Sequence, residues 1–167
     1  MSRLDIAIRG IKAARGYTEQ LLNKISLDDW FRQPNEGVTH VAWQVGHLAV
    51  AEYAITMRRI RGPRPQDEAL IPNEFLEKFG RLSVPHPDPK ANPEPARIRE
   101  VFDHVHRQAL AEIESLSDSE LDESTAEPPH PMHRTRFEAL QWCSQHEFLH
   151  AGEIALLRRL LGSDPLW

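Results

Sequence analysis

The sequence predicts an all-α fold, a four-helix bundle with up-down-down-up connectivity and a long crossover between its second and third helices. Apolar residues recur at helical spacing in four long segments, and no segment alternates as a half-buried strand would. Eight of the 13 prolines fall between residues 62 and 95, which breaks up any long helix there. A chain of 167 residues suits a single domain, 1–167, with a core of its own.

Two long helices are expected in the first part of the chain. The first spans residues 4–24 and has one apolar face, formed by Leu4, Ala7, Ile11, Ala14, Leu21 and Ile25. A short helical turn is expected after Ser26, which caps a segment with two early aspartates. The second long helix begins at Thr39, a suitable cap, and ends near Arg61, before a Gly-Pro pair.

The second half of the chain supplies the other two long helices. Residues 62–95 form an irregular connection that contains a short helix over residues 73–79. This connection is long enough to return the chain along a helix of roughly 33 Å, so the third helix can run parallel to the second. The third helix begins near Pro95 and its apolar face extends to Leu116, and the fourth spans residues 135–161.

Composition restricts the possible partners and compartment. The net charge is −5 and no dense Lys/Arg stripe is present, so no nucleic-acid partner is expected. The N-terminal residues contain no long apolar run, so neither a signal peptide nor a membrane partner is expected. The single cysteine, Cys143, excludes an internal disulfide and fits a reducing, cytoplasmic location.

Three histidines lie on apolar helix faces, which is unusual for a polar ring. His146 and His150 are one turn apart in the fourth helix, and His47 lies in the second, followed by small residues on the same face. Buried imidazoles need partners, and a transition metal satisfies several at once. If these helices pack together, the three rings form the protein part of an open metal site. A metal-free bundle, or a site closed by Cys143, is the alternative.

These residues also carry a resemblance to the DinB-like (YfiT-like) superfamily of metal-dependent hydrolases and thiol S-transferases. The similar segments are residues 45–49, 146–154 and 157–162. The resemblance implies a bundle in which His47, His146 and His150 bind a divalent transition metal, zinc or nickel first, often in a homodimer. It also implies a small-molecule substrate. Glu153 departs from the resemblance, because many relatives carry glutamine there.

The reaction that the resemblance implies is a thiol-dependent S-transfer to small electrophiles. The co-substrate would be a low-molecular-weight thiol such as mycothiol, bacillithiol or glutathione. Hydrolysis of a small ester or amide is the alternative, and a non-catalytic metal-binding bundle is a third possibility. In either reaction the nucleophile is a thiol or water held at the metal.

The segment His146-Glu-Phe-Leu-His150 also matches the zinc-protease motif His-Glu-x-x-His. The extended form of that motif requires a third histidine at position 156, which is leucine here. No sheet is predicted that could hold an extended peptide. These two departures disfavour a protease.

Several further side chains are candidates for the site. Glu147 and Glu153 are the candidate catalytic carboxylates. For Glu147 a solvated surface charge is the favoured interpretation, and a partner that orients a histidine is the alternative. His133, Arg134 and Trp43 are candidate substrate contacts, and His130 lies in the same Pro-rich stretch as His133. Cys143 is interpreted as a small buried apolar residue.

Overall fold

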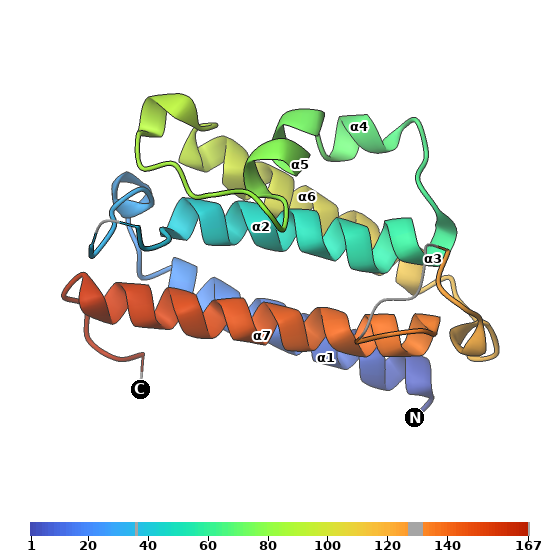
Figure 1. The fold of residues 1–167 in the computed structure, drawn as a ribbon. Coiled ribbons are helices and arrows are strands. Elements are labelled where there is room, and N and C mark those ends of the chain that lie inside the picture. The colour runs from blue at the N-terminus through green and yellow to red at the C-terminus, as the bar shows by residue number, and fades with distance from the viewer. Residues whose placement is uncertain (36, 127–131, 167) are drawn as a thin grey trace.

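A computed structural model of the chain describes residues 1–35, 37–126 and 132–166, and over these residues the fold is all-α, as predicted. Four long helical segments form the bundle, and shorter helices lie in the connections (Figure 1). An isolated antiparallel bridge joins Ser124 and Thr135, and the described residues contain no β-strand. No helix of the described part is long and apolar enough to cross a membrane.

The first and last helices begin at complete capping boxes. In α1 (Arg3–Leu22) the Ser2 hydroxyl accepts from the backbone of Asp5, whose carboxylate accepts from the Ser2 backbone. Thr135 and Glu138 make the same reciprocal pair at the start of α7 (Arg136–Leu160). Each box satisfies two backbone N–H groups that a helix start otherwise leaves without partners.

The second helical segment differs from the single helix predicted over residues 39–61. It consists of α2 (Val41–Tyr53), a π-helical turn (Ala54–Arg58) and α3 (Arg59–Arg61). Its cap is His40 and not Thr39, because the His40 Nδ1 accepts from the Trp43 backbone at 3.0 Å. The His40 Nε2 hydrogen-bonds the His86 carbonyl, so the same ring also holds the long connection.

The connection to the third long helix folds back over α2 (Figure 1). It contains α4 (Asp67–Leu70), the predicted short helix α5 (Asn73–Phe79) and a 3₁₀ turn (Pro89–Ala91). Gly46 in α2 allows this close approach, since a Cβ at that position would lie 2.5 Å from the Phe79 ring. The third long helix, α6 (Pro95–Ile113), follows and ends three residues before the predicted Leu116.

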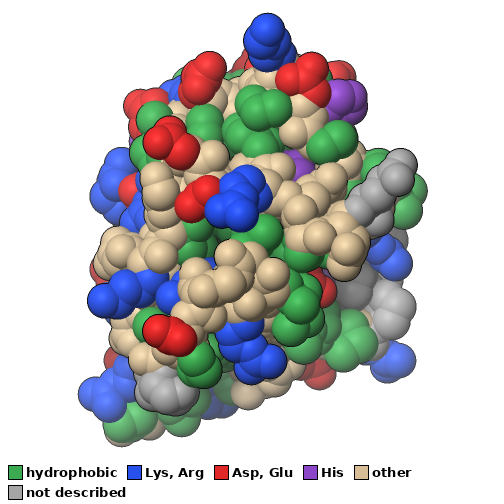
Figure 2. Space-filling model, turned by 90° about the vertical axis from the view of Figure 1, so that its left-hand side faces the viewer, with side chains coloured by type: hydrophobic (Ala, Val, Ile, Leu, Met, Phe, Trp, Pro, Cys, Tyr) green, Lys and Arg blue, Asp and Glu red, His purple; other side chains and the backbone are tan. Residues whose placement is uncertain are grey.

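The long helices pack as two pairs (Figure 1). Helices α1 and α7 lie side by side and run in one direction, whereas α2 and α6 lie side by side and run in the other. The buried core is largely apolar and includes the rings of Trp30, Phe79 and Phe102. At the end of the bundle seen in Figure 2, acidic and basic side chains are interspersed, without the single-sign basic stripe of a nucleic-acid-binding surface.

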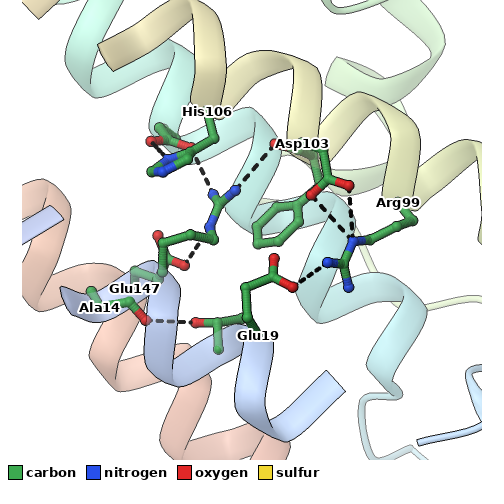
Figure 3. Close-up of polar contacts among 10 residues, drawn as sticks. Ala14, Glu19, Arg99, Asp103, His106 and Glu147 are labelled. Atoms are coloured by element: carbon green, nitrogen blue, oxygen red, sulfur yellow. Dashed lines mark hydrogen bonds and ion pairs between the residues drawn. The ribbon is translucent and has the colours of Figure 1, made fainter. Parts of the chain in front are cut away.

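A buried ion network ties all four long helices together. The Arg15 guanidinium on α1 donates to Glu52 on α2 at 2.7 Å and to Glu147 on α7 at 2.8 Å. It also lies over the Phe102 ring of α6, 3.4 Å from its centroid. His106 on α6 completes the network with a 2.7 Å contact to Glu52 (Figure 3). Burial alone would lower the pKa of Arg15, but the Glu52 and Glu147 carboxylates have the larger combined effect and raise it above the ordinary value.

Glu147 is therefore not the solvated surface charge that its polar side chain indicated. Its exposed fraction is 3%, and its carboxylate is bound to Arg15 inside the bundle. The pKa of Glu147 is raised by burial, with Arg15 acting in the opposite direction. The surface interpretation was wrong because the partner of Glu147 is Arg15 on α1, which is far away along the chain.

Candidate metal centre

The packing of α2 against α7 brings His47, His146 and His150 together. One ring nitrogen of each lies within 4.8 Å of the others. The ring centroid of His47 lies 5.3 Å from that of His146 and 4.7 Å from that of His150. The ring centroids of His146 and His150 are 4.5 Å apart. Over the described residues this is the one group of three or more His, Cys, Asp or Glu side chains close enough to hold a metal ion.

His47 is held in a defined orientation and protonation state. Its Nδ1–H donates to the Phe79 carbonyl at 2.8 Å, which leaves the Nε2 lone pair available to a ligand or metal. Burial lowers the pKa of His47 to about 4, so the ring is neutral near pH 7. The Trp43 ring stacks on it at 4.8 Å with an interplanar angle of 6°. A neutral, oriented imidazole is the form that binds transition metals.

His150 is oriented by a two-step hydrogen-bond chain. Its Nδ1–H donates to the Gln44 side-chain oxygen at 2.5 Å. The Gln44 amide in turn donates to Glu153 at 2.6 Å. Glu153 also lies 3.3 Å from the His150 Nδ1, and the hydrogen bond to His150 is the largest cause of its lowered pKa. Carboxylates and amides behind metal-binding histidines fix the ring and increase its basicity.

The residues present fit a divalent transition metal. Two of the three histidines hold their Nδ1 in protein hydrogen bonds, so their Nε2 atoms are available to the same ion. Three imidazole donors suit zinc, nickel, copper, cobalt or iron and do not suit magnesium or calcium, which prefer oxygen. Cys143 is not part of the cluster, although it lies one turn before His146. Among the described residues, the cluster therefore offers three imidazole donors to a metal ion and no fourth protein ligand.

The open side of the cluster faces a cavity of about 570 Å³. His47 and His146 form part of its wall, together with Trp142. The small residues that follow His47 on its helix face also line it, and they are Val50, Ala51 and Ala54. These small side chains therefore leave room beside the His47 ring. The volume matches the range of small-molecule sites.

The candidate substrate contacts have different positions. His133 is buried and lines the cavity. Arg134 is exposed and is not part of the cavity wall. Trp43 lies behind His47, where its indole N–H donates to Ser83 at 3.0 Å. His130 lies outside the described residues.

The two candidate carboxylates also differ. Glu147 is bound to Arg15 in the bundle interior, and its partners are not the histidines. Glu153 is in contact with His150 and Gln44, which suits a role in orienting the ring. Cys143 is a buried residue, as interpreted, and burial raises the pKa of its thiol well above the ordinary value.

Four residues of the site were not found from the sequence. Gln44 and Phe79 hold the rings, and Arg59 and Arg81 line the cavity. Gln44 is three residues before His47 on the same helix, so helical spacing could have indicated it. Phe79 acts through its backbone, and the position of Arg81 depends on how the connection folds, so neither leaves a signal in the residue types.

The fold and the cluster together define a class of protein, an α-helical bundle with an open three-histidine site. A model of the DinB superfamily matches residues 11–154, and the chain belongs to this superfamily. Comparison with curated proteins and with solved structures gave no significant match.

Proposed function

We propose that the protein is a metal-dependent enzyme that transfers a low-molecular-weight thiol to a small electrophile. His47, His146 and His150 would hold the metal, with zinc or nickel as the first candidates. The observation that carries the proposal is the open side of the cluster, which faces a cavity large enough for both reactants. A structural metal site would instead be closed by a fourth protein ligand.

A bound divalent metal would supply Lewis acidity, which favours the deprotonated form of a thiol or water nucleophile. The Phe79 carbonyl and Gln44 keep the His47 and His150 rings in the orientation that this requires. Apolar side chains such as Val50 and Trp142 keep water away from the reactants. In the transfer, the thiol proton passes to solvent and the thiolate sulfur bonds to the electrophilic carbon. The bond from that carbon to the leaving group breaks, and the leaving group departs with the bonding electrons.

The setting of the enzyme is part of the proposal. The single cysteine supports a reducing, cytoplasmic location, where low-molecular-weight thiols are available. Apolar side chains exposed on α7, among them Leu149, Leu156 and Leu160, support a homodimer. Trp167, a further candidate for the dimer contact, lies outside the described residues.

The proposal is tested by loading the protein with zinc or nickel and measuring conjugation of monochlorobimane with mycothiol, bacillithiol and glutathione. We expect acceleration with at least one thiol, its loss in His47→Ala, and its retention in His104→Ala, an exposed histidine of α6 outside the site. Metal-dependent hydrolysis of 4-nitrophenyl acetate without any thiol conjugation would identify a hydrolase instead. Stoichiometric metal without either reaction would identify a non-catalytic site.

A further inference from the structure

The described lining of the cavity beside the histidines contains basic side chains, whereas the chain as a whole is acidic. The protein has 25 acidic and 20 basic side chains. The described wall of the cavity nevertheless contains two arginines, Arg59 and Arg81, and no carboxylate. Most of its other side chains are apolar, so a charge placed there is poorly screened by water. Such a wall favours a ligand with negative charge.

Arg59 reaches this wall because of the π-helical turn. Along an unbroken α-helix, the residue eleven positions after His47 returns to the His47 face, and that residue is Arg58. A π-turn contains about one residue more than an α-turn, since its hydrogen bonds join residues five apart. The turn over residues 54–58 therefore moves the register by one, and Arg59 takes the place of Arg58 on the cavity face.

The neighbouring arginine confirms this change of register. Arg58 lies in a different hollow, together with Tyr53 and Pro63. In the π-turn the Thr56 hydroxyl donates to the Glu52 carbonyl at 2.6 Å, and this bond satisfies a backbone oxygen of the altered ladder. Irregular turns of this kind inside helices occur frequently at functional sites.

Arg81 approaches the cavity from the connection after α5. It is exposed, and among the described residues it makes no ion pair. Several other arginines, such as Arg61 and Arg99, are instead paired with carboxylates. An exposed, unpaired guanidinium at the edge of a cavity keeps its donors available for a carboxylate or another oxyanion, which it can bind in a bidentate manner.

We propose that Arg59 and Arg81 bind an acidic group of the substrate, and that the π-turn is the feature that places Arg59 there. This proposal rests on the proposed function, since it concerns the same cavity. Arg59 is twelve residues after His47, or roughly 18 Å along a helix, and its side chain leans back toward His47. The acidic group is thus held away from the reacting atoms and contributes to binding more than to the chemical step.

The first test needs neither metal nor turnover. The probes are 8-anilinonaphthalene-1-sulfonate and its uncharged counterpart N-phenyl-1-naphthylamine, and their affinities are measured by fluorescence titration of the metal-free protein. We expect Arg59→Gln and Arg81→Gln each to weaken sulfonate binding by roughly ten-fold, as loss of one charged hydrogen-bond partner does. Binding of the uncharged dye should stay within about two-fold.

Arg58→Gln is the matched control, because it removes the same charge one residue away. It should leave sulfonate affinity unchanged. An equal loss in Arg58→Gln and Arg59→Gln would show a general charge effect and would overturn the role of the π-turn. Equal binding of both dyes by the wild type, or failure of the sulfonate to bind, would overturn the anion site. His47→Ala should still bind the sulfonate more tightly than the uncharged dye. The anion site is therefore tested independently of the proposed enzymatic activity.

A second test identifies which reactant carries the acid. Conjugation of monochlorobimane is compared for glutathione and glutathione diethyl ester, and conjugation of an uncharged thiol is compared for 4-(bromomethyl)phenylacetic acid and its amide. A KM that rises about ten-fold in Arg59→Gln for one acidic reactant, with kcat little changed, assigns the acid to that reactant. Loss of kcat with an unchanged KM for every acidic reactant would contradict a binding role.

Discussion

Helices α2 and α7 each contribute to two polar clusters inside the bundle, and the clusters are built in opposite ways. The histidine cluster consists of neutral rings that share an open side facing a cavity. The Arg15 cluster consists of charged groups, Glu52 and Glu147 among them, that bind one another within the bundle. Glu147 directly follows His146 in the sequence, yet a rotation of about 100° places it in the other cluster. The comparison separates a site kept available for a ligand from a site that holds the helices together.

The largest expected effect comes from breaking the closed cluster. Arg15→Met leaves Glu52 and Glu147 buried without their cation, so we expect the free energy of unfolding to fall by about 3–5 kcal/mol. Urea denaturation followed by circular dichroism measures it. A loss below about 1 kcal/mol would mean that the buried ion pairs contribute little to stability.

Removing a histidine of the cluster should weaken metal binding strongly and change the stability of the fold only slightly. His47→Ala is expected to lower zinc affinity by more than about 100-fold, while the free energy of unfolding without metal changes by only about 1 kcal/mol. Competition with a fluorescent chelator measures the affinity. His104→Ala serves as the control, and an equal loss of affinity there would remove the distinction between the two clusters.

The hydrogen-bond chain behind His150 sharpens the comparison. Gln44→Leu removes the acceptor for the His150 Nδ1–H and is expected to weaken zinc binding by about 10-fold. Glu153→Gln keeps an oxygen that accepts from the Gln44 amide, so a change within about three-fold is expected. The same chelator competition distinguishes them. If Glu153→Gln weakened binding as much as Gln44→Leu, the carboxylate charge itself would be what supports the ring.

The smallest effect concerns Cys143, which lies one turn before His146 on α7. Burial raises the pKa of its thiol well above the ordinary value, so the reactive thiolate is nearly absent at pH 8. We therefore expect iodoacetamide to leave the folded protein unlabelled at pH 8 and to label it fully in urea. Intact-mass spectrometry reads both states. Rapid labelling of the folded protein would indicate an accessible, acidic cysteine at the site.

The predictable features were those set by spacing within one helix. The apolar stripes located four long helical segments, and the i, i+4 pair His146 and His150 indicated the metal cluster. The predicted start of the fourth helix at Thr135 lies within one residue of the observed one, because Thr135 caps α7 and pairs reciprocally with Glu138. His40 was missed as the cap of α2, since histidine is an uncommon residue for that role.

The features that escaped prediction depend on partners far away in sequence. The charge of Glu147 is explained by Arg15, which lies 132 residues away. The π-turn contains the Thr56 hydrogen bond to the Glu52 carbonyl, and no residue pattern identified it. Arg59 could not be placed on the cavity wall from the sequence, because regular α-helical geometry turns it off the His47 face.

The central claim is that three imidazoles hold one divalent metal and leave a position free. X-ray absorption spectroscopy of the zinc-loaded protein tests it most directly, with elemental analysis for stoichiometry. The account predicts one zinc per chain, scattering from three histidine rings and one further light atom, and loss of one ring in His47→Ala. A sulfur atom in the coordination shell, or a wild-type spectrum unaffected by removal of His47, would contradict it.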